Sequence, residues 1–209
     1  LYAPLALIFF YSFNANPINM AIWSGFTLDW YRMLFGMQPA GAAFDAAFTE
    51  NPDRIYQVVR NSLIVALSAS AISTAIGTAT ALATARFEFF GKRIYQALLF
   101  LPMIMPDIVL GIALLIFFVG AGFKLSLVTI IIGHCTFLSC YVYIVVSARL
   151  VSMDTALEKA SADLGAGPIT TFRRITLPLI MPGVLGGFLL AFIISLDDVV
   201  ITYFIAGVD

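Results

Sequence analysis

Long apolar stretches alternate with polar links along this chain, and each long stretch predicts a membrane-spanning helix. The stretches at 62–85, 94–119, 125–147 and 182–206 are long enough, because about 20 apolar residues cross the hydrocarbon core of a bilayer. The apolar residues 1–13 are too few to span, and we expect them to be the tail of a first helix. The pattern predicts an all-α, polytopic membrane protein with about five helices in this chain.

Some of these predicted helices contain residues that shape membrane helices. The 62–85 stretch is rich in Ala, Ser, Thr and Gly, so we expect it to pack closely against other helices. Pro102 and Pro106 predict a kink in the third helix, because proline lacks a backbone N–H and its ring crowds the preceding turn. Pro182 is expected to open the last helix.

Composition and charge agree with a membrane protein. Hydrophobic residues make up 61% of the 209 residues and charged residues 11%, whereas soluble domains have roughly 25% charged residues. The net charge of -1 implies no nucleic-acid partner. Basic residues gather in the links 86–93 and 148–178, which the positive-inside rule assigns to the cytoplasm, with 14–60 outside.

The second of these basic links has the features of a folded loop. Thr155 and Glu158 fit a capping box at a helix start, and Gly165 fits a left-handed helix end. Pro168 fits the first position of a second short helix, which we expect Pro178 to end. From local physics alone, an amphipathic loop on the membrane surface and a docking site for a soluble partner both stay open.

The loop resembles the EAA loop of permease subunits in binding-protein-dependent ATP-binding cassette (ABC) importers. That family pattern is Glu-Ala-Ala, three residues, Gly, nine residues and Ile-x-Leu-Pro, and Gly165 and the segment 175–178 match its spacing. The triplet departs from the pattern, because it reads Lys-Ala-Ser and the acidic residue stands one place earlier. The resemblance implies that residues 152–178 are a cytoplasmic coupling loop that sits in a groove of an ATPase subunit. The residues it assigns to ATPase coupling are Glu158, Lys159, Ala160, Ser161, Asp163, Gly165, Ile175, Leu177 and Pro178.

Other segments resemble the second permease subunit of spermidine/putrescine importers, namely residues 24–31, 106–109 and 195–200. This resemblance implies a type I permease-like fold, with one transmembrane domain over residues 1–209 and a further helix beyond it. It implies a bacterial inner-membrane subunit without catalytic activity, which moves polyamines inward by alternating access. The implied partners are a second permease subunit, two ATPase subunits, an external substrate-binding protein and membrane lipid. The sequence departs from the family at 37–60, which is longer, and at Cys140, where we expect proline.

Carboxylates within the apolar stretches are candidates for a transport path. Asp107, Asp197 and Asp198 lie in predicted helices, where an unpaired charge costs several kcal/mol. We therefore expect them to face a water-filled path or a partner, although hydrogen bonding between helices stays open. Polyamines are multiply cationic and would favour such acidic steps. The resemblance implies these substrate-path residues: Asp107, Ser195, Asp197, Asp198 and Trp30.

The remaining chemistry in the sequence is sparse. His134 is the only histidine, and we expect packing or one hydrogen bond for it rather than a metal site with Cys135 or Cys140. Gly91-Lys92-Arg93 lacks the rest of a phosphate-binding loop, so ATP hydrolysis is expected from another chain, and no cofactor is implied. A permease for another small solute, an ion-coupled secondary transporter and a membrane anchor of a redox complex stay open as alternatives.

Overall fold

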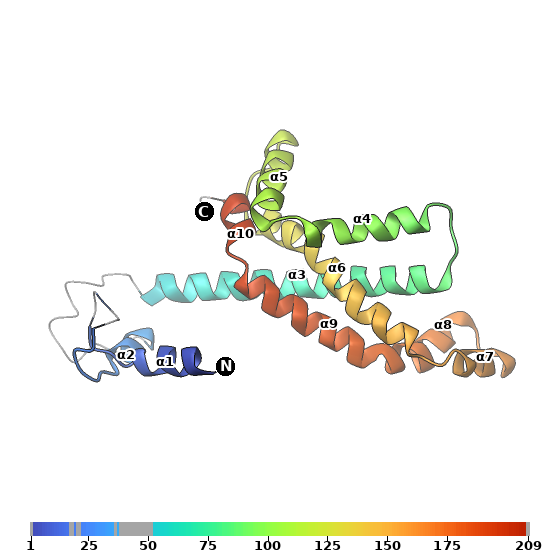
Figure 1. Ribbon diagram of the computed structural model, residues 1–209, viewed down its shortest axis with the longest axis horizontal. Helices are drawn as coiled ribbons and strands as arrows, with labels where there is room; N and C mark the ends of the chain where they lie inside the picture. Colours follow the sequence, from blue (N-terminus) through green and yellow to red (C-terminus); the bar gives the residue numbers. More distant parts are fainter. Residues whose placement is uncertain (1, 17–18, 20–21, 36, 38–51, 208–209) are drawn as a thin grey trace. The chain divides into compact units, whose positions relative to one another are not determined.

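The computed structural model describes residues 2–16, 19, 22–35, 37 and 52–207. Within them the chain is helical, which confirms the all-α prediction, and it divides into two compact units, residues 1–60 and 61–209. Figure 1 labels the helices α1 to α10. In chain order the elements are α1 (Ala3–Tyr11), α2 (Asp29–Leu34), α3 (Pro52–Arg86), α4 (Lys92–Ile104), α5 (Asp107–Gly120), α6 (Leu127–Val151), α7 (Ala156–Asp163), α8 (Pro168–Thr171), the π-helical turn η1 (Phe172–Thr176), α9 (Leu177–Asp197) and α10 (Val200–Ile205).

The first unit is held by aromatic rings and a folded turn. Asn14 and Phe26 form an isolated antiparallel bridge, and the rings of Phe13 and Phe26 stack with centroids 5.2 Å apart. The indole N–H of Trp30 donates to the carbonyl of Asn14 at 2.9 Å. Most of the segment that the sequence marks as longer than in the family, residues 38–51, lies outside the described residues.

In the part of the chain that the structure describes, three helical runs are long and apolar enough to cross a membrane: Ile55–Arg86, Leu127–Val151 and Pro168–Asp197. A fourth possible span is broken, because α4 and α5 meet at an angle of 107°. The kink predicted from Pro102 and Pro106 is confirmed at Pro106, as a full break at Met105 and Pro106 with extended backbone, whereas Pro102 lies inside α4. Proline disfavours the helical conformation in the residue before it, which explains the site of the break.

The last span differs from the sequence-based expectation. Pro178 lies in the first turn of α9 and Pro182 inside it, so the prediction that one ends a helix and the other opens the next is wrong. The helical run continues from Pro168 to Asp197. The π-turn η1 directly precedes α9, and its wider winding leaves room for the ring of Pro178, which would crowd the preceding turn of a regular α-helix.

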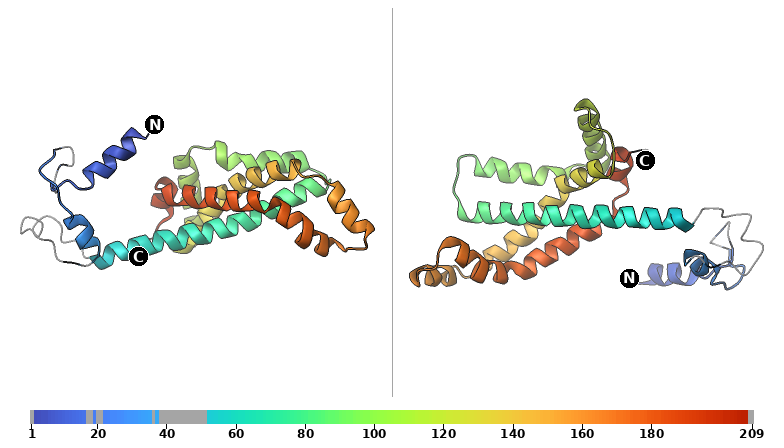
Figure 2. Two further views of the ribbon diagram at one scale, coloured as in Figure 1. Left: turned by 90° about the horizontal axis from the view of Figure 1, so that it is seen from below. Right: turned by 180° about the vertical axis from the view of Figure 1, so that it is seen from behind.

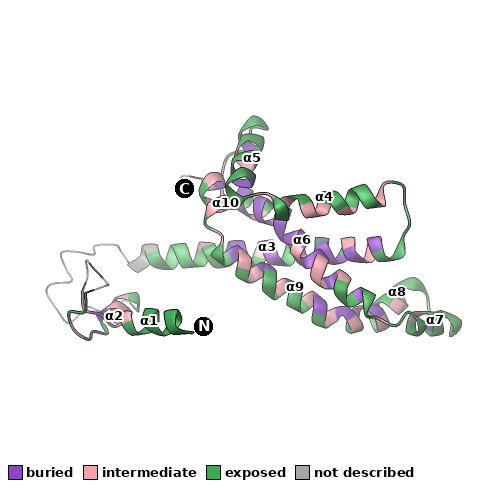
Figure 3. Ribbon diagram, viewed as in Figure 1, coloured by how far each residue is buried: buried purple, intermediate pink, exposed green. Residues whose placement is uncertain are grey.

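Helix α6 lies at the centre of the second unit. Its Val142 is fully buried and contacts glycines of two other helices, Gly77 of α3 and Gly187 of α9. Figure 3 shows buried residues concentrated along α6. Both views of Figure 2 show α4 running back beside α3, where the hydroxyls of Thr80 and Tyr95 lie 3.5 Å apart. The small residues of α3 thus allow the close packing that the sequence predicts.

The contact between α3 and α6 leaves no room for a side chain at Gly77. A Cβ there would lie 2.7 Å from the Cβ of Val142 and 2.8 Å from the carbonyl oxygen of Ser139. We expect Gly77→Ala to lower the stability of the folded protein by about 1–3 kcal/mol, the usual cost of overpacking. The control is Gly186→Ala, whose Cβ would meet its nearest neighbour at 3.9 Å. Thermal unfolding of the two purified variants tests this, and equal midpoints would contradict the packing argument.

At each end of the second unit, a polar contact connects two helices. At one end, the guanidinium of Arg86, the last residue of α3, forms an ion pair with Glu158 of α7. At the other end, the hydroxyl of Thr129 in α6 donates to the carbonyl of Ile205 in α10 at 3.0 Å. The basic links 86–93 and 148–178 therefore lie at the same end, as the positive-inside rule requires.

Candidate functional site

Two helix breaks bring acidic side chains to one pocket. Asp107 is the first residue of α5, directly after the break at Pro106, and Asp197 is the last residue of α9, directly before the break at Asp198. All three carboxylates line a pocket of about 220 Å³. The other lining residues are Pro102, Met103, Phe137, Tyr141, Ile194, Val199 and Val200.

Two of these carboxylates are free to meet a cation. Asp107 and Asp197 are exposed, and within the described ranges neither carboxylate has a hydrogen bond or an ion pair. Asp107 lies in the first turn of α5, where the positive end of the helix dipole stabilises a negative charge. The pocket thus presents two carboxyl groups whose hydrogen-bonding capacity is open to a ligand.

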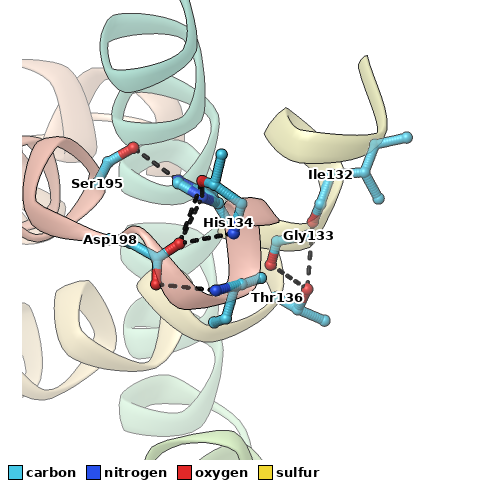
Figure 4. Close-up of polar contacts among 8 residues, drawn as sticks. Ile132, Gly133, His134, Thr136, Ser195 and Asp198 are labelled. Atoms are coloured by element: carbon cyan, nitrogen blue, oxygen red, sulfur yellow. Dashed lines mark hydrogen bonds and ion pairs between the residues drawn. The ribbon is translucent and has the colours of Figure 1, made fainter. Parts of the chain in front are cut away.

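Asp198 is held differently from its neighbour. Its Oδ2 accepts from the backbone N–H of Thr202 at 3.0 Å and from the hydroxyl of Thr202 at 3.2 Å, and its Oδ1 lies 3.4 Å from the backbone nitrogen of Ile201. The Nε2 of His134 lies 3.1 Å from the same Oδ2. Asp198 therefore caps the start of α10 and links it to α6 (Figure 4).

Ser195 and Trp30 are not among the residues that line this pocket. The hydroxyl of Ser195 is buried and lies 2.8 Å from the Nδ1 of His134, and Trp30 belongs to the first unit. The sequence predicted packing or one hydrogen bond for His134, whereas the structure gives it contacts with Ser195, Thr202 and Asp198. The described residues contain no cluster of three or more His, Cys, Asp or Glu side chains that could hold a metal ion.

The coupling-loop segment contains the helix end that its glycine predicts. Gly165 has φ +80°. Its N–H donates to the carbonyl of Ala162 at 2.9 Å, and the N–H of Ala166 donates to the carbonyl of Ser161 at 3.1 Å. These two bonds form a Schellman motif, which satisfies carbonyls at the helix end. Pro168 takes the first position of α8, so both predictions are confirmed.

The predicted capping box is wrong. The Thr155 side chain makes no cap hydrogen bond, and the carboxylate of Asp154 instead accepts from the N–H of Ala156 at 2.8 Å. Glu158 turns inward, where its carboxylate accepts from the hydroxyl of Thr176 and pairs with Arg86. A positive charge and a hydroxyl from distant parts of the chain thus replace the local backbone N–H as partners of Glu158.

The other candidate coupling residues divide between the surface and the interior. Ser161 is buried, with its hydroxyl 3.0 Å from that of Thr171. Ile175 and Leu177 are half-buried, and the exposed members are Lys159, Ala160, Asp163, Gly165 and Pro178. Two apolar side chains outside the predicted set of coupling residues are strongly exposed, Leu164 at 89% and Ile169 at 83%. Their position beside Gly165 and Pro168, where short helices end and begin, was the available signal.

A larger groove of about 670 Å³ lies beside this loop. Its lining is mostly apolar, with residues such as Ala79, Leu82 and Phe172, and its two charged side chains, Arg86 and Glu158, are paired with each other. We assign the candidate substrate site to the smaller pocket, because of these two hollows only the smaller is lined by carboxylates that lack a partner among the described residues.

Comparison with known proteins identifies the family. A family model described as "Binding-protein-dependent transport system inner membrane component" matches residues 73–208, a range that includes the coupling-loop segment and the acidic pocket. The chain belongs to this family. It is therefore an inner-membrane component of a transport system, a role that is not enzymatic in itself. Broken helices alone would also fit an ion-coupled secondary transporter, and family membership decides between the two.

Several curated relatives match over nearly the whole chain. The spermidine/putrescine transport system permease protein PotC of Haemophilus influenzae is 36% identical over 209 residues, which is 100% of this chain and 75% of that protein. PotC of Escherichia coli K12 is 36% identical over 99% of this chain and 72% of its own length. The putrescine transport system permease protein PotI of the same strain is 35% identical over 99% of this chain and 70% of its own length.

Proposed function

We propose that this chain is the transmembrane permease subunit of an ATP-driven importer that moves polyamines into the cytoplasm. The observation that carries the proposal is the pocket between two helix breaks, into which Asp107 and Asp197 present unpaired carboxylates. The similarity of the whole chain to permeases for spermidine and putrescine supports it.

The pocket's chemistry matches that of a polyamine. An ammonium group about 4 Å from a carboxylate gains about 4 kcal/mol where the effective dielectric constant is near 20. The methylene groups between ammonium groups need apolar contacts, which Met103 and Ile194 offer. The rings of Phe137 and Tyr141 also line the pocket, and an aromatic face attracts a cation.

The loop from α7 to η1 is the surface that we assign to the ATPase subunit. Leu164 and Ile169 expose apolar side chains beside the exposed Lys159, a combination suited to an apolar contact with a charged rim. Behind this surface, Glu158 connects the loop to the end of α3 through Arg86 and to the start of α9 through Thr176. A movement of the loop that follows ATP binding would thus pass to two spanning helices together.

The complete importer would contain a second permease subunit, two ATPase subunits and an external binding protein. ATP binding closes the ATPase pair, the coupling loop moves, and the path opens outward to receive substrate from the binding protein. A permease for another small solute is the second candidate, because the binding protein sets much of the selectivity.

The test is uptake by the reconstituted complex in proteoliposomes. We expect ATP inside the vesicles to drive uptake of labelled spermidine and putrescine, and an ion gradient without ATP to drive none. This chain without its ATPase partner should hydrolyse no ATP above background. ATP-driven uptake of a neutral or anionic solute, with no polyamine uptake, would rule out a polyamine as the substrate. The assignment of this chain as a permease subunit would still stand. ATP hydrolysis by this chain alone would contradict the assignment of hydrolysis to a separate ATPase subunit.

A further inference from the structure

A buried polar cluster links α6, α9 and α10 behind the acidic pocket. At its centre is His134, whose side chain is fully buried. Its Nδ1 lies 2.8 Å from the hydroxyl of Ser195 in α9, and its Nε2 lies 3.0 Å from the hydroxyl of Thr202 in α10 and 3.1 Å from the carboxylate of Asp198 (Figure 4). The cluster therefore spans both sides of the break between α9 and α10.

A neutral imidazole with its proton on Nε2 satisfies these contacts. The Nε2–H donates to the Asp198 carboxylate, which can only accept when ionised, and the Ser195 hydroxyl donates to the bare Nδ1. The hydroxyl of Thr202 donates to the same carboxylate. The Asp198 carboxylate thus sets the tautomer, because it only accepts and requires the proton on Nε2. The Ser195 hydroxyl holds the orientation of the ring through its contact with Nδ1.

The position of Asp198 sets the rim of the pocket. Within the described part of the chain, His134 is the side chain from another spanning helix that reaches Asp198, and the other partners of this carboxylate all belong to α10. The N–H of Asp198 donates the last hydrogen bond of α9, to the carbonyl of Ile194 at 3.0 Å, and the backbone at Asp198 is extended. Beyond that bond, the side-chain contacts of Asp198 connect α9 to α10 and α6. Asp197 and Val199, the neighbours of Asp198 on either side, both line the pocket.

We propose that His134 is a positioning residue of the transport path, which acts through Asp198, and that Ser195 acts through His134. The proposal rests on the proposed function, since it assigns the acidic pocket to the substrate. In this arrangement the free carboxylate of Asp197 keeps a fixed distance from that of Asp107. The spacing between them selects among cations whose ammonium groups are differently spaced.

The first measurement needs no substrate. A cysteine placed at the exposed rim position by Val199→Cys, with Cys135 and Cys140 replaced by Ala, reports the position of the rim through its rate of labelling by a water-soluble thiol reagent. We expect His134→Leu to change this rate at least about threefold, and His134→Gln, which keeps a donor toward Asp198, to leave it near the parent value. An unchanged rate in His134→Leu overturns the proposal.

The second measurement is the ratio of spermidine to putrescine uptake by the complete complex. We expect His134→Leu to lower uptake about tenfold, the scale of one lost hydrogen bond to a charged group, and to change the ratio. The matched control is Leu138→Ala, a fully buried change on the same helix, which should lower the amount of complex and leave the ratio unchanged. A ratio unchanged in His134→Leu reduces His134 to a structural role and overturns the proposal.

A double-mutant cycle tests whether the effect passes through Asp198. His134→Leu combined with Asp198→Ala should take up no less polyamine than Asp198→Ala alone, because alanine at position 198 already removes the contact with His134. Losses of uptake that add in the double variant would contradict the claim that His134 acts through Asp198. If the parent complex imports no polyamine while the labelling result holds, the substrate assignment fails and the positioning role stands.

Discussion

Neutralising either free carboxylate of the pocket, by Asp107→Asn or by Asp197→Asn, should lower polyamine uptake at least about tenfold without loss of assembled complex. Asparagine keeps the size of aspartate and much of its hydrogen bonding, and removes only the charge. Each carboxylate lies exposed in the pocket without a protein partner among the described residues, so its loss leaves no buried group unsatisfied. A charge pair about 4 Å apart gains about 4 kcal/mol of Coulomb energy at an effective dielectric constant near 20. Solvent screening of the exposed carboxylates reduces this gain, and a tenfold effect needs about 1.4 kcal/mol of it.

The measurement compares initial uptake of labelled spermidine with the yield of purified complex for each variant. Glu88→Gln is the control for charge alone, because Glu88 pairs with Lys92 on the surface, outside this pocket. Asp198→Asn should differ from the other two by also lowering the yield, since its carboxylate caps α10 and meets His134. Unchanged uptake in both Asp107→Asn and Asp197→Asn would contradict the hypothesis that a cationic substrate passes through this pocket.

Features set by neighbouring residues were predictable from the sequence. Gly165 ends a helix in the left-handed conformation because only a residue without a Cβ adopts it freely, and the break at Pro106 follows from the missing N–H and the restricted preceding residue. The small residues of α3 predict close packing in the same way. Each of these signals acts within a few residues, so a single sequence contains it.

Features set by distant partners were not predictable. The ion pair between Arg86 and Glu158 joins residues 72 positions apart, and nothing in the local pattern around Glu158 distinguishes it from a capping residue. Likewise, the sequence places Asp197 and Asp198 together in one apolar stretch. Which of the two is buried depends on where α9 ends and on His134, a residue more than 60 positions earlier.

The start of the last span shows a third kind of limit. Two prolines in an apolar stretch predict helix boundaries, yet α9 contains both Pro178 and Pro182. The wider π-turn before Pro178 relieves the clash between a proline ring and the carbonyl one turn earlier, which the rule assumes. At Pro182 the missing N–H costs one helical hydrogen bond, a loss that membrane-spanning helices tolerate. The proposed coupling loop is consequently connected to α9 by the continuous helical run Pro168–Asp197, so we expect the connection between them to be stiff.

Gly165→Val should uncouple ATP hydrolysis from transport while the permease remains inserted and assembled. The position has φ +80° and open space around the missing Cβ, so the cost comes from backbone conformation alone. A β-branched residue in this region costs on the order of 1–3 kcal/mol, enough to displace the Schellman turn that sets the angle between α7 and α8. The exposed Leu164 and Ile169 would then leave their positions on the proposed ATPase-docking surface.

Two controls separate this strain from side-chain bulk. Gly167→Val adds the same side chain two residues later, where φ is -71° and space is also open, so coupling should survive. Gly165→Asn should keep most coupling as well, because asparagine tolerates the left-handed region. The quantity to measure is polyamine imported per ATP hydrolysed by the assembled complex. Equal ratios for Gly165→Val and Gly167→Val would mean that the turn at Gly165 does not transmit the nucleotide-driven movement, and that the link to the ATPase lies elsewhere on the chain.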